Sequence, residues 1–315
     1  MKRKIVFFLL RFFLGFGLLY YLVFHHAQPQ SILIVFNDVS WPMVLLAFSL
    51  HSLGLFFSAK RWKLILDEKG SGFTLWQLTQ SLLVGTFFNH FLPTRFGGDV
   101  VRVRDTRQIE QGMTASLAVV VYERMSGIAA LLVLAMISSL LKIRFISEMP
   151  LLYVSLLVSL AGILLLLLAW KRLPRGFLAG MRCPRPWLQK TLRHLDMFHG
   201  IILDFLQHRQ LSKKVFFWAF FLQLNVVVHY FFIGQALQLV RIPFIDYFFA
   251  IPILLFILSV PLSINGIGVR DLFLVKLFVY YQYSASLAIA FSMIDVAFNL
   301  VLGILGGLIY IFRKK

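Results

Sequence analysis

Apolar runs of about 20 residues recur along this chain, and they constrain its fold more than any other feature. A helix needs roughly 20 mostly apolar residues to cross a hydrocarbon core of about 30 Å. The chain is 60% hydrophobic and 14% charged, whereas soluble domains carry about 25% charged residues. We therefore expect an all-α integral membrane protein. Its six full crossings are predicted at residues 5–24, 41–59, 114–141, 151–170, 215–238 and 284–311.

The first apolar run follows the basic start Met1–Lys4, which is also typical of a secretory signal peptide. This run is long, and no small-residue cleavage site precedes His25. We interpret it as a membrane helix.

The distribution of Lys and Arg predicts how the chain is oriented, because cytoplasmic loops carry an excess of both. Basic residues gather at the start of the chain, in 60–72, in the 171–214 loop and at Arg313–Lys315, whereas 25–40 has none. We expect both termini to be cytoplasmic, in the inner or plasma membrane. The 171–214 loop contains an expected amphipathic helix around 187–207, beside anionic headgroups.

The net charge of +18 could serve nucleic acid or anionic lipid. Because the chain is so apolar, we expect membrane lipids as partners and no nucleic acid. Self-association into a homo-oligomer stays open.

Two further apolar stretches are interrupted by proline and glycine. The first, 73–112, breaks at 93–99, and the second, 247–282, breaks at 261–268. In each, an arginine follows the proline by nine residues. Proline removes a backbone donor and glycine permits positive φ, so both breaks should unwind a helix.

Irregular backbone at membrane depth occurs only where protein buries it or where it lines a wet cavity. We therefore predict two re-entrant hairpins that enter from opposite faces, inside a single transmembrane domain spanning 1–315. Repeat 1 would cover roughly 41–141 and repeat 2 roughly 215–311, as an inverted repeat. The alternative is two ordinary interhelix loops that happen to contain Pro and Gly.

Each break leads into a half-helix whose free N–H groups and positive dipole end favour an anion. The candidate substrate-binding residues are therefore the polar and charged residues near the two breaks and on the 114–141 helix, together with the glycines of the breaks. They are Asn89, His90, Arg95, Gly97, Gly98, Asp99, Arg102, Glu123, Arg124, Asn265, Gly266, Gly268, Arg270 and Asp271.

Glu123 and Arg124 lie inside a predicted crossing, where charges are costly. Adjacent residues on a helix do not face each other, so each needs another partner. Glu123 is expected to pair with Arg102 or Arg270. Arg124 is expected to pair with Asp99 or Asp271. Whether Glu123 and Arg124 hold the scaffold or touch substrate stays open.

Other polar residues in the crossings are expected to join helices rather than to bind substrate. They are His51, Asn225, His229, Asp295 and Asn299.

The sequence contains no HExxH, GxSxG or P-loop motif, so we expect no enzyme activity. Its eight histidines are scattered and Cys183 is its single cysteine. We therefore expect no metal site and no cofactor.

The chain resembles the lysylphosphatidylglycerol synthase transmembrane-region family, flippase-like proteins related to the membrane half of the bacterial multiple peptide resistance factor. The resemblance covers about 5–311 and is carried by Asn89–Pro93, Gly97–Arg102, Glu123–Arg124 with Gly127, and Pro261–Arg270. Family members usually have Arg-Glu where this chain has Arg270-Asp271. No synthase domain follows within these 315 residues, so aminoacyl transfer to lipid is not implied.

The resemblance implies movement of an anionic or polar-headed lipid between leaflets. We expect a lipid translocase for a phospholipid or a polyprenyl-phosphate-linked sugar. Arg102, Arg270 and the glycine backbones would hold the phosphate. Two alternatives remain: a membrane enzyme acting on a lipid-linked substrate, with Glu123 or Asp99 as general base, and a non-transporting scaffold.

Overall fold

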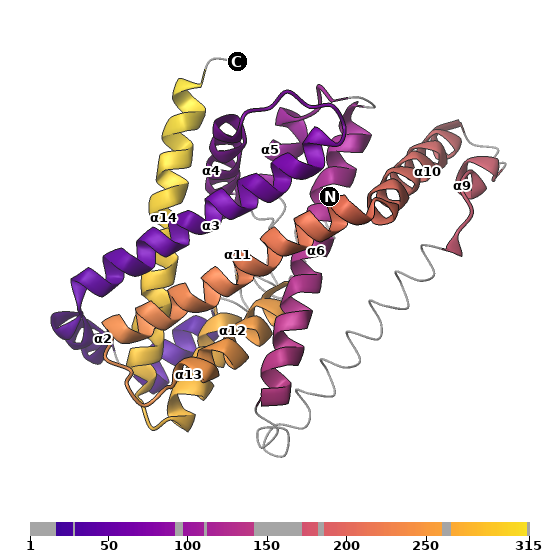
Figure 1. Ribbon diagram of the computed structural model, residues 1–315. Coiled ribbons are helices and arrows are strands. Elements are labelled where there is room, and N and C mark those ends of the chain that lie inside the picture. Colours follow the sequence, from indigo (N-terminus) through magenta and orange to yellow (C-terminus); the bar gives the residue numbers. More distant parts are fainter. Residues whose placement is uncertain are drawn as a thin grey trace.

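The computed structural model describes residues 17–27, 29–91, 97–109, 112–141, 172–181, 186–259 and 266–313. Within these ranges the chain is helical and contains no strand (Figure 1). The elements are η1 (Leu22–Ala27), α2 (Pro29–Val35), η2 (Phe36–Asp38), α3 (Trp41–Asp67), α4 (Leu75–Phe91), α5 (Gly97–Asp105), α6 (Gly112–Leu141), α9 (Phe177–Gly180), α10 (Pro186–Gln207), α11 (Arg209–Ala236), α12 (Phe244–Ser259), α13 (Val269–Tyr280) and α14 (Ala285–Phe312).

Four helices are long and apolar enough to cross a membrane: Trp41–Asp67, Gly112–Ser138, Arg209–Ala236 and Ala285–Phe312. They confirm four of the six predicted crossings. The predicted crossing at 151–170, and most of the one at 5–24, lie outside the described residues. An all-helical chain with several such helices is an integral membrane protein.

Helix α3 is longer than predicted, so the loop expected at 60–72 begins only after Asp67. The helix continues to Asp67, and Arg61, Trp62, Ile65 and Leu66 are buried within this extension. Its apolar side chains recur at helical spacing and pack into the core, so the helix does not end where the first charges appear.

Each broken segment forms two helices, as the Pro and Gly pattern predicts. The first gives α4 and α5, and the second gives α12 and α13. The residues between them, 92–96 and 260–265, lie outside the described residues, together with Arg95 and Asn265. The re-entrant course of these two segments therefore stays a prediction.

Helices α3 and α11 pack along each other in opposite directions (Figure 1). The Ser40 N–H, just before α3, donates to the Ala236 carbonyl at the end of α11 at 3.0 Å. At the other end Glu68, just after α3, lies 3.6 Å from His208, just before α11. Contacts at both ends therefore join α3 and α11 along their full length.

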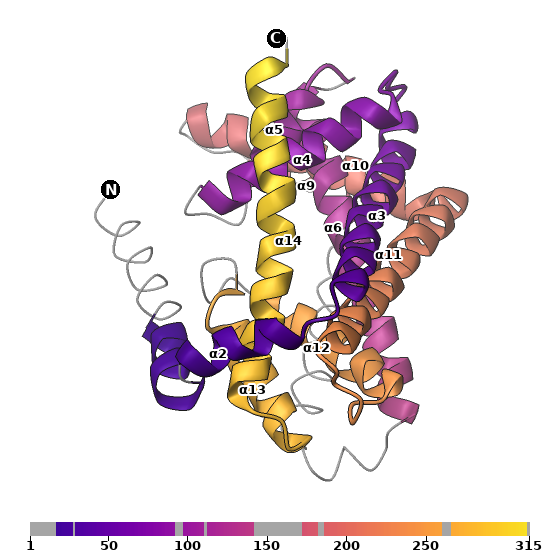
Figure 2. The same ribbon diagram turned by 90° about the vertical axis from the view of Figure 1, so that its left-hand side faces the viewer.

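The remaining helices are interleaved between the two halves of the chain. Helix α4 packs on α14, and α12 packs on α6 (Figure 2). The order long helix, two short helices, long helix occurs in α3–α6 and again in α11–α14. The first short helix of each group, α4 or α12, packs on the last long helix of the other group, α14 or α6.

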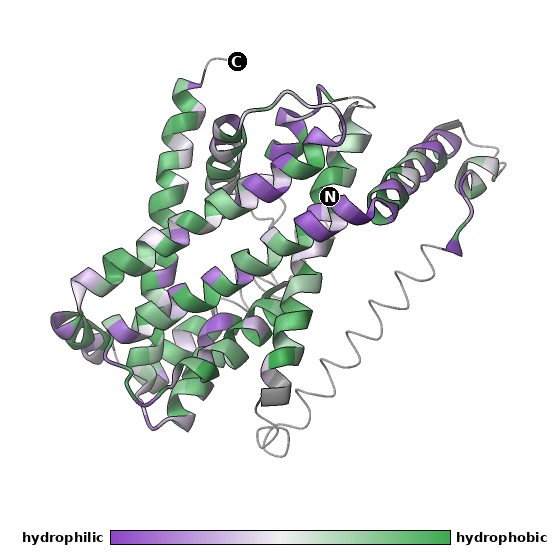
Figure 3. Cartoon of the chain, in the orientation of Figure 1, coloured by the Kyte–Doolittle hydropathy of each residue, from purple (hydrophilic) through white to green (hydrophobic). Residues whose placement is uncertain are grey.

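The amphipathic helix expected around 187–207 is confirmed as α10. It buries Ile201, Ile202 and Phe205 and packs on α6. Its remaining surface alternates polar and apolar residues, and it projects from the bundle at the end where α3 finishes (Figure 3).

Helices α4 and α14 approach closely because α14 contributes Gly303, Gly306 and Gly307, which we call the glycine seam. A Cβ on Gly306 would overlap the carbonyl group of Leu83. A Cβ on Gly303 would meet only ordinary contacts, the nearest at 3.7 Å. Small residues commonly allow such close backbone approach between membrane helices.

We expect Gly306→Ala to destabilise the protein by about 1–3 kcal/mol, since the added methyl group must push α4 away from α14. Thermal unfolding in lipid nanodiscs measures the change. Gly303→Ala is the matched control, because it adds the same methyl group to the same helix without overlap. Equal melting temperatures for the two variants would contradict the assigned packing.

Candidate functional site

The first charged cluster forms where α3, α5 and α6 meet. Glu123 on α6 is 1% exposed and accepts hydrogen bonds from Arg61 on α3 and Arg102 on α5. The Arg61 Nη2 to Glu123 Oε1 distance is 2.7 Å, and Arg102 Nη2 contacts the other oxygen. One carboxylate therefore ties three helices together.

Asp99 extends this cluster toward the surface. Its carboxylate lies 2.5 Å from Arg124 Nη2 and 3.7 Å from Arg102 Nη1. The Arg124 side chain is 46% exposed, whereas that of Arg102 is 9% exposed. The cluster thus leads from an accessible arginine to a buried one.

These contacts confirm one of the two partners proposed for each residue on α6. Glu123 pairs with Arg102, and Arg124 pairs with Asp99. Arg270 and Asp271, the other proposed partners, belong to a second cluster.

The first cluster carries a net positive charge, since three arginines face the two carboxylates of Asp99 and Glu123. Arg102 also stacks on Trp62, with its guanidinium carbon 4.2 Å from the ring centroid. Two buried donors, Arg61 Nη1 and Arg102 Nε, have no hydrogen-bond partner among the described residues. Buried N–H donors in a positive environment favour an anionic guest.

The start of α5 is held against α4 by backbone contacts. The Gly98 N–H donates to Asn89 Oδ1 at 2.7 Å, and a Cβ on Gly98 would come within 2.7 Å of the Gly85 carbonyl oxygen. Gly97 is buried beside it. Asn89 thus caps α5, and His90 bonds through Nδ1 to the Thr86 carbonyl at 2.8 Å. Both side chains position backbone in this structure.

The second charged cluster lies between α13 and α14. Arg270 Nη1 is 2.8 Å from Asp295 Oδ2. Asp271 accepts the N–H of Gly268 at 2.7 Å and the hydroxyl of Ser292. The turn before α13 needs glycine, because Gly266 and Gly268 have φ values of 78° and 82°.

The structure brings two of the scattered histidines together, which corrects the expectation that they are dispersed. The rings of His51 on α3 and His229 on α11 have centroids 5.0 Å apart. His229 Nε2 lies 3.6 Å from Asp295 Oδ1. The second cluster thus includes two imidazoles that were expected only to join helices.

Sequence reasoning missed Arg61 and underestimated Asp295. Arg61 lies in a basic stretch that resembles a cytoplasmic loop, and the signal against a loop is the run of apolar residues that follows it in α3. Asp295 is the direct partner of Arg270. Its only sequence signal is a carboxylate in the middle of an apolar helix.

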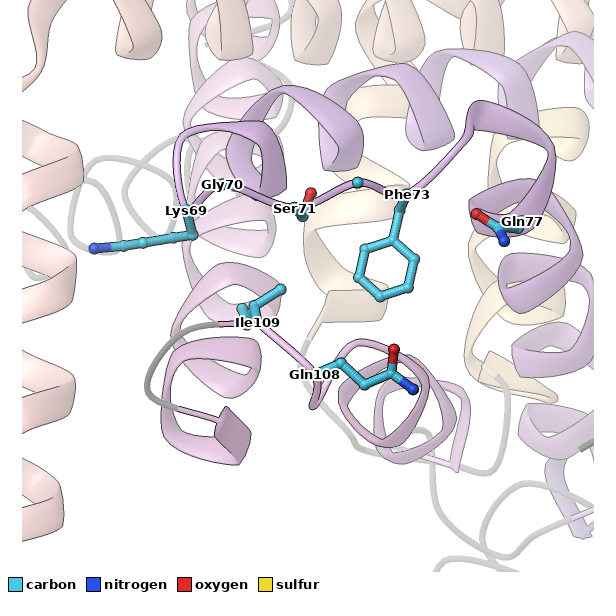
Figure 4. A pocket seen from close by; sticks show the side chains of 8 residues that line it. Lys69, Gly70, Ser71, Phe73, Gln77, Gln108 and Ile109 are labelled. Atoms are coloured by element: carbon cyan, nitrogen blue, oxygen red, sulfur yellow. The ribbon is translucent and has the colours of Figure 1, made fainter.

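A surface cavity of about 490 Å³ lies at the turn between α3 and α4 (Figure 4). Its single charged side chain, Lys69, points away from Phe73 and Gln77. Residues of both charged clusters are absent from its lining, which consists of Lys69, Gly70, Ser71, Gly72, Phe73, Gln77, Gln108 and Ile109.

We expect Glu123→Gln to destabilise the protein by about 3–5 kcal/mol, because Arg61 and Arg102 would lose their shared buried counter-charge. Glu68→Gln is the control, since Glu68 is exposed and pairs with His208 at the surface. Thermal unfolding of the purified variants measures the difference. A Glu123→Gln melting temperature equal to that of Glu68→Gln would rule out this account of the first cluster.

Comparison with protein-family models matches residues 8–307 to the lysylphosphatidylglycerol synthase TM region. Comparisons with curated proteins and with solved structures gave no match. The finer relation to the multiple peptide resistance factor stays a prediction. The family match covers nearly the whole chain, including both charged clusters. The protein therefore belongs to the lysylphosphatidylglycerol synthase transmembrane-region family.

Proposed function

We propose that this protein is a lipid translocase that moves an anionic or polar-headed lipid, such as a phospholipid or a polyprenyl-phosphate-linked sugar, between leaflets. The observation that carries the proposal is the first charged cluster, which places buried arginines with unused donors inside a membrane protein. The family name supports a role in lipid handling.

The headgroup phosphate would enter at Arg124, the most exposed arginine of the cluster, and move toward Arg102. Asp99 contacts both arginines, so it would exchange partners as the phosphate displaces it. The N-terminus of α5 at Gly97 and Gly98 adds backbone donors and a positive dipole end. The acyl chains would remain in the bilayer.

Arg270 would act differently, because Asp295 and Asp271 already balance its charge. It would meet the headgroup only when its pair with Asp295 opens. We assign the second cluster to the conformational exchange that opens one side of the membrane at a time.

The interleaved packing supports an inverted repeat as the frame for this exchange. The groups α3–α6 and α11–α14 share their element order, and their first helices run in opposite directions. Transporters built from inverted repeats place the substrate site at broken helices near the midplane. Helices α4–α5 and α12–α13 are the broken helices of this proposal.

Translocation in this scheme makes and breaks no covalent bond, so we propose a non-enzymatic role. A membrane enzyme would need a second substrate site, and a scaffold would need no buried arginines with unused donors. We place the protein in the inner or plasma membrane with both termini cytoplasmic. Among the described residues, Lys and Arg are concentrated at the end of α3, in α5 and in α10, and these segments lie toward the same end of the bundle (Figure 1).

We expect purified protein in proteoliposomes to accelerate movement of a fluorescent phosphatidylglycerol, measured by its protection from an outside quencher. Arg102→Gln should reduce the accelerated rate at least about tenfold, a change of about 1.4 kcal/mol in the barrier. Arg102→Lys should restore part of the rate, because it keeps the charge but loses the bidentate geometry.

Arg175→Gln is the matched control, since Arg175 is exposed on the basic loop and pairs with Asp204. Its rate should equal that of the wild type. No acceleration by wild-type protein with phosphatidylglycerol, a zwitterionic lipid or a polyprenyl phosphate would refute the translocase. Normal rates for Arg102→Gln would refute the assigned site.

The orientation can be tested with single cysteines in a Cys183→Ser background. We expect Val240→Cys, in the exposed turn between α11 and α12, to react with a membrane-impermeant maleimide added to spheroplasts. Lys190→Cys on α10 should react only after permeabilisation, which also serves as the labelling control. The opposite pattern would reverse the proposed orientation.

A further inference from the structure

Three membrane-crossing helices bring nitrogen and carboxylate ligands to one place. His51 comes from α3, His229 from α11 and Asp295 from α14. One ligand atom from each lies within 4.8 Å of the other two. Helix packing alone does not require three such groups to converge. Apolar side chains can fill the space between membrane helices and leave no polar atom without a hydrogen-bond partner.

His229 is 2% exposed, and Nε2, its ring nitrogen that faces Asp295, has no hydrogen-bond partner in the described part of the chain. Buried polar atoms normally have a partner, so an unpaired imidazole nitrogen indicates a ligand. Its Nε2 lies 3.6 Å from Asp295 Oδ1. Two ligands of a tetrahedral Zn²⁺, each about 2.0–2.2 Å from the ion, are separated by about 3.4 Å. The observed spacing matches an ion held between these atoms.

The carboxylate is already oriented for this role. Asp295 Oδ2 receives Arg270 at 2.8 Å, which leaves Oδ1 directed at His229. Such outer contacts fix the geometry of a metal ligand. His51 is half-buried, and its ligand atom lies within 4.8 Å of those of His229 and Asp295.

The surroundings favour a cation. Arg270 faces two carboxylates, Asp271 and Asp295, so the second cluster has a net charge of −1 with neutral imidazoles. Phe298 packs on both histidines, at 5.8 Å from His51 and 5.9 Å from His229. Neutral imidazole and carboxylate ligands suit a borderline transition metal better than Na⁺ or Mg²⁺.

We propose that His51, His229 and Asp295 bind one divalent transition-metal ion of the Zn²⁺ class. Three protein ligands leave a fourth position for water or an anionic oxygen, as in open zinc sites. A bound ion would fasten α3 of the first group to α11 and α14 of the second group. The site is separate from the first cluster and shares Asp295 with the second, so it is tested by metal binding and not by lipid movement.

The test uses untagged full-length protein in nanodiscs, stripped with a chelator and titrated with Co²⁺ as a spectroscopic probe. We expect one Co²⁺ per chain with the visible absorption of a four-coordinate site, and displacement of Co²⁺ by Zn²⁺. His229→Gln and His51→Gln should each weaken binding at least about tenfold, since losing a ligand costs no less than losing its outer contact.

His194→Gln is the matched control, because His194 is exposed on α10 and lies outside the cluster. It should bind Co²⁺ as the wild type does. Melting temperatures without metal establish that each variant is folded. Wild-type protein without a Co²⁺ band, or His229→Gln binding as tightly as wild type while folded, would overturn the proposal.

Discussion

The pairing of one buried carboxylate with two arginines holds three helices of this protein together. Glu123 joins α3, α5 and α6, and in a membrane its partners cannot be replaced by water. Helix α5 has only nine residues, too few to be stable alone. It keeps its place because Arg102 anchors it to α6 and the Asn89 cap anchors it to α4. The positions of Asp99 and Arg124 follow from this anchoring.

Hydropathy and charge predicted much of this arrangement, because unpaired charges and unpaired polar groups are costly inside a membrane. Four crossings follow from length and apolar content alone. The cost of unpaired charge predicted an ion pair for Glu123 and for Arg124 but left two candidate partners for each, and the structure has Arg102 and Asp99 in these places. Arg61 escaped prediction because its partner lies 62 residues away, and nothing local separates a buried arginine from one in a basic loop. The meeting of His51 with His229 depends on how α3 crosses α11, which spacing along one helix does not encode.

The two clusters have similar sequence motifs and opposite electrostatics. Each has an arginine nine residues after a proline, but the first adds two more arginines and the second adds Asp295. Sequence reasoning assigned an anion to both breaks. Among the described residues, the carboxylates are placed so that only the first cluster has excess positive charge. The roles proposed for the two clusters rest on this difference.

The packing of α4 on α14 at the glycine seam can form only late in the synthesis of the chain. Helix α4 finds its tightest partner in α14, which begins about 190 residues later in the chain. At typical rates of about 5–20 residues per second, the ribosome needs roughly 10–40 s to make the intervening chain. Throughout that interval α4 lacks its final neighbour. The surface of α4 that later packs on α14 would have to be covered by the insertion machinery until α14 is made.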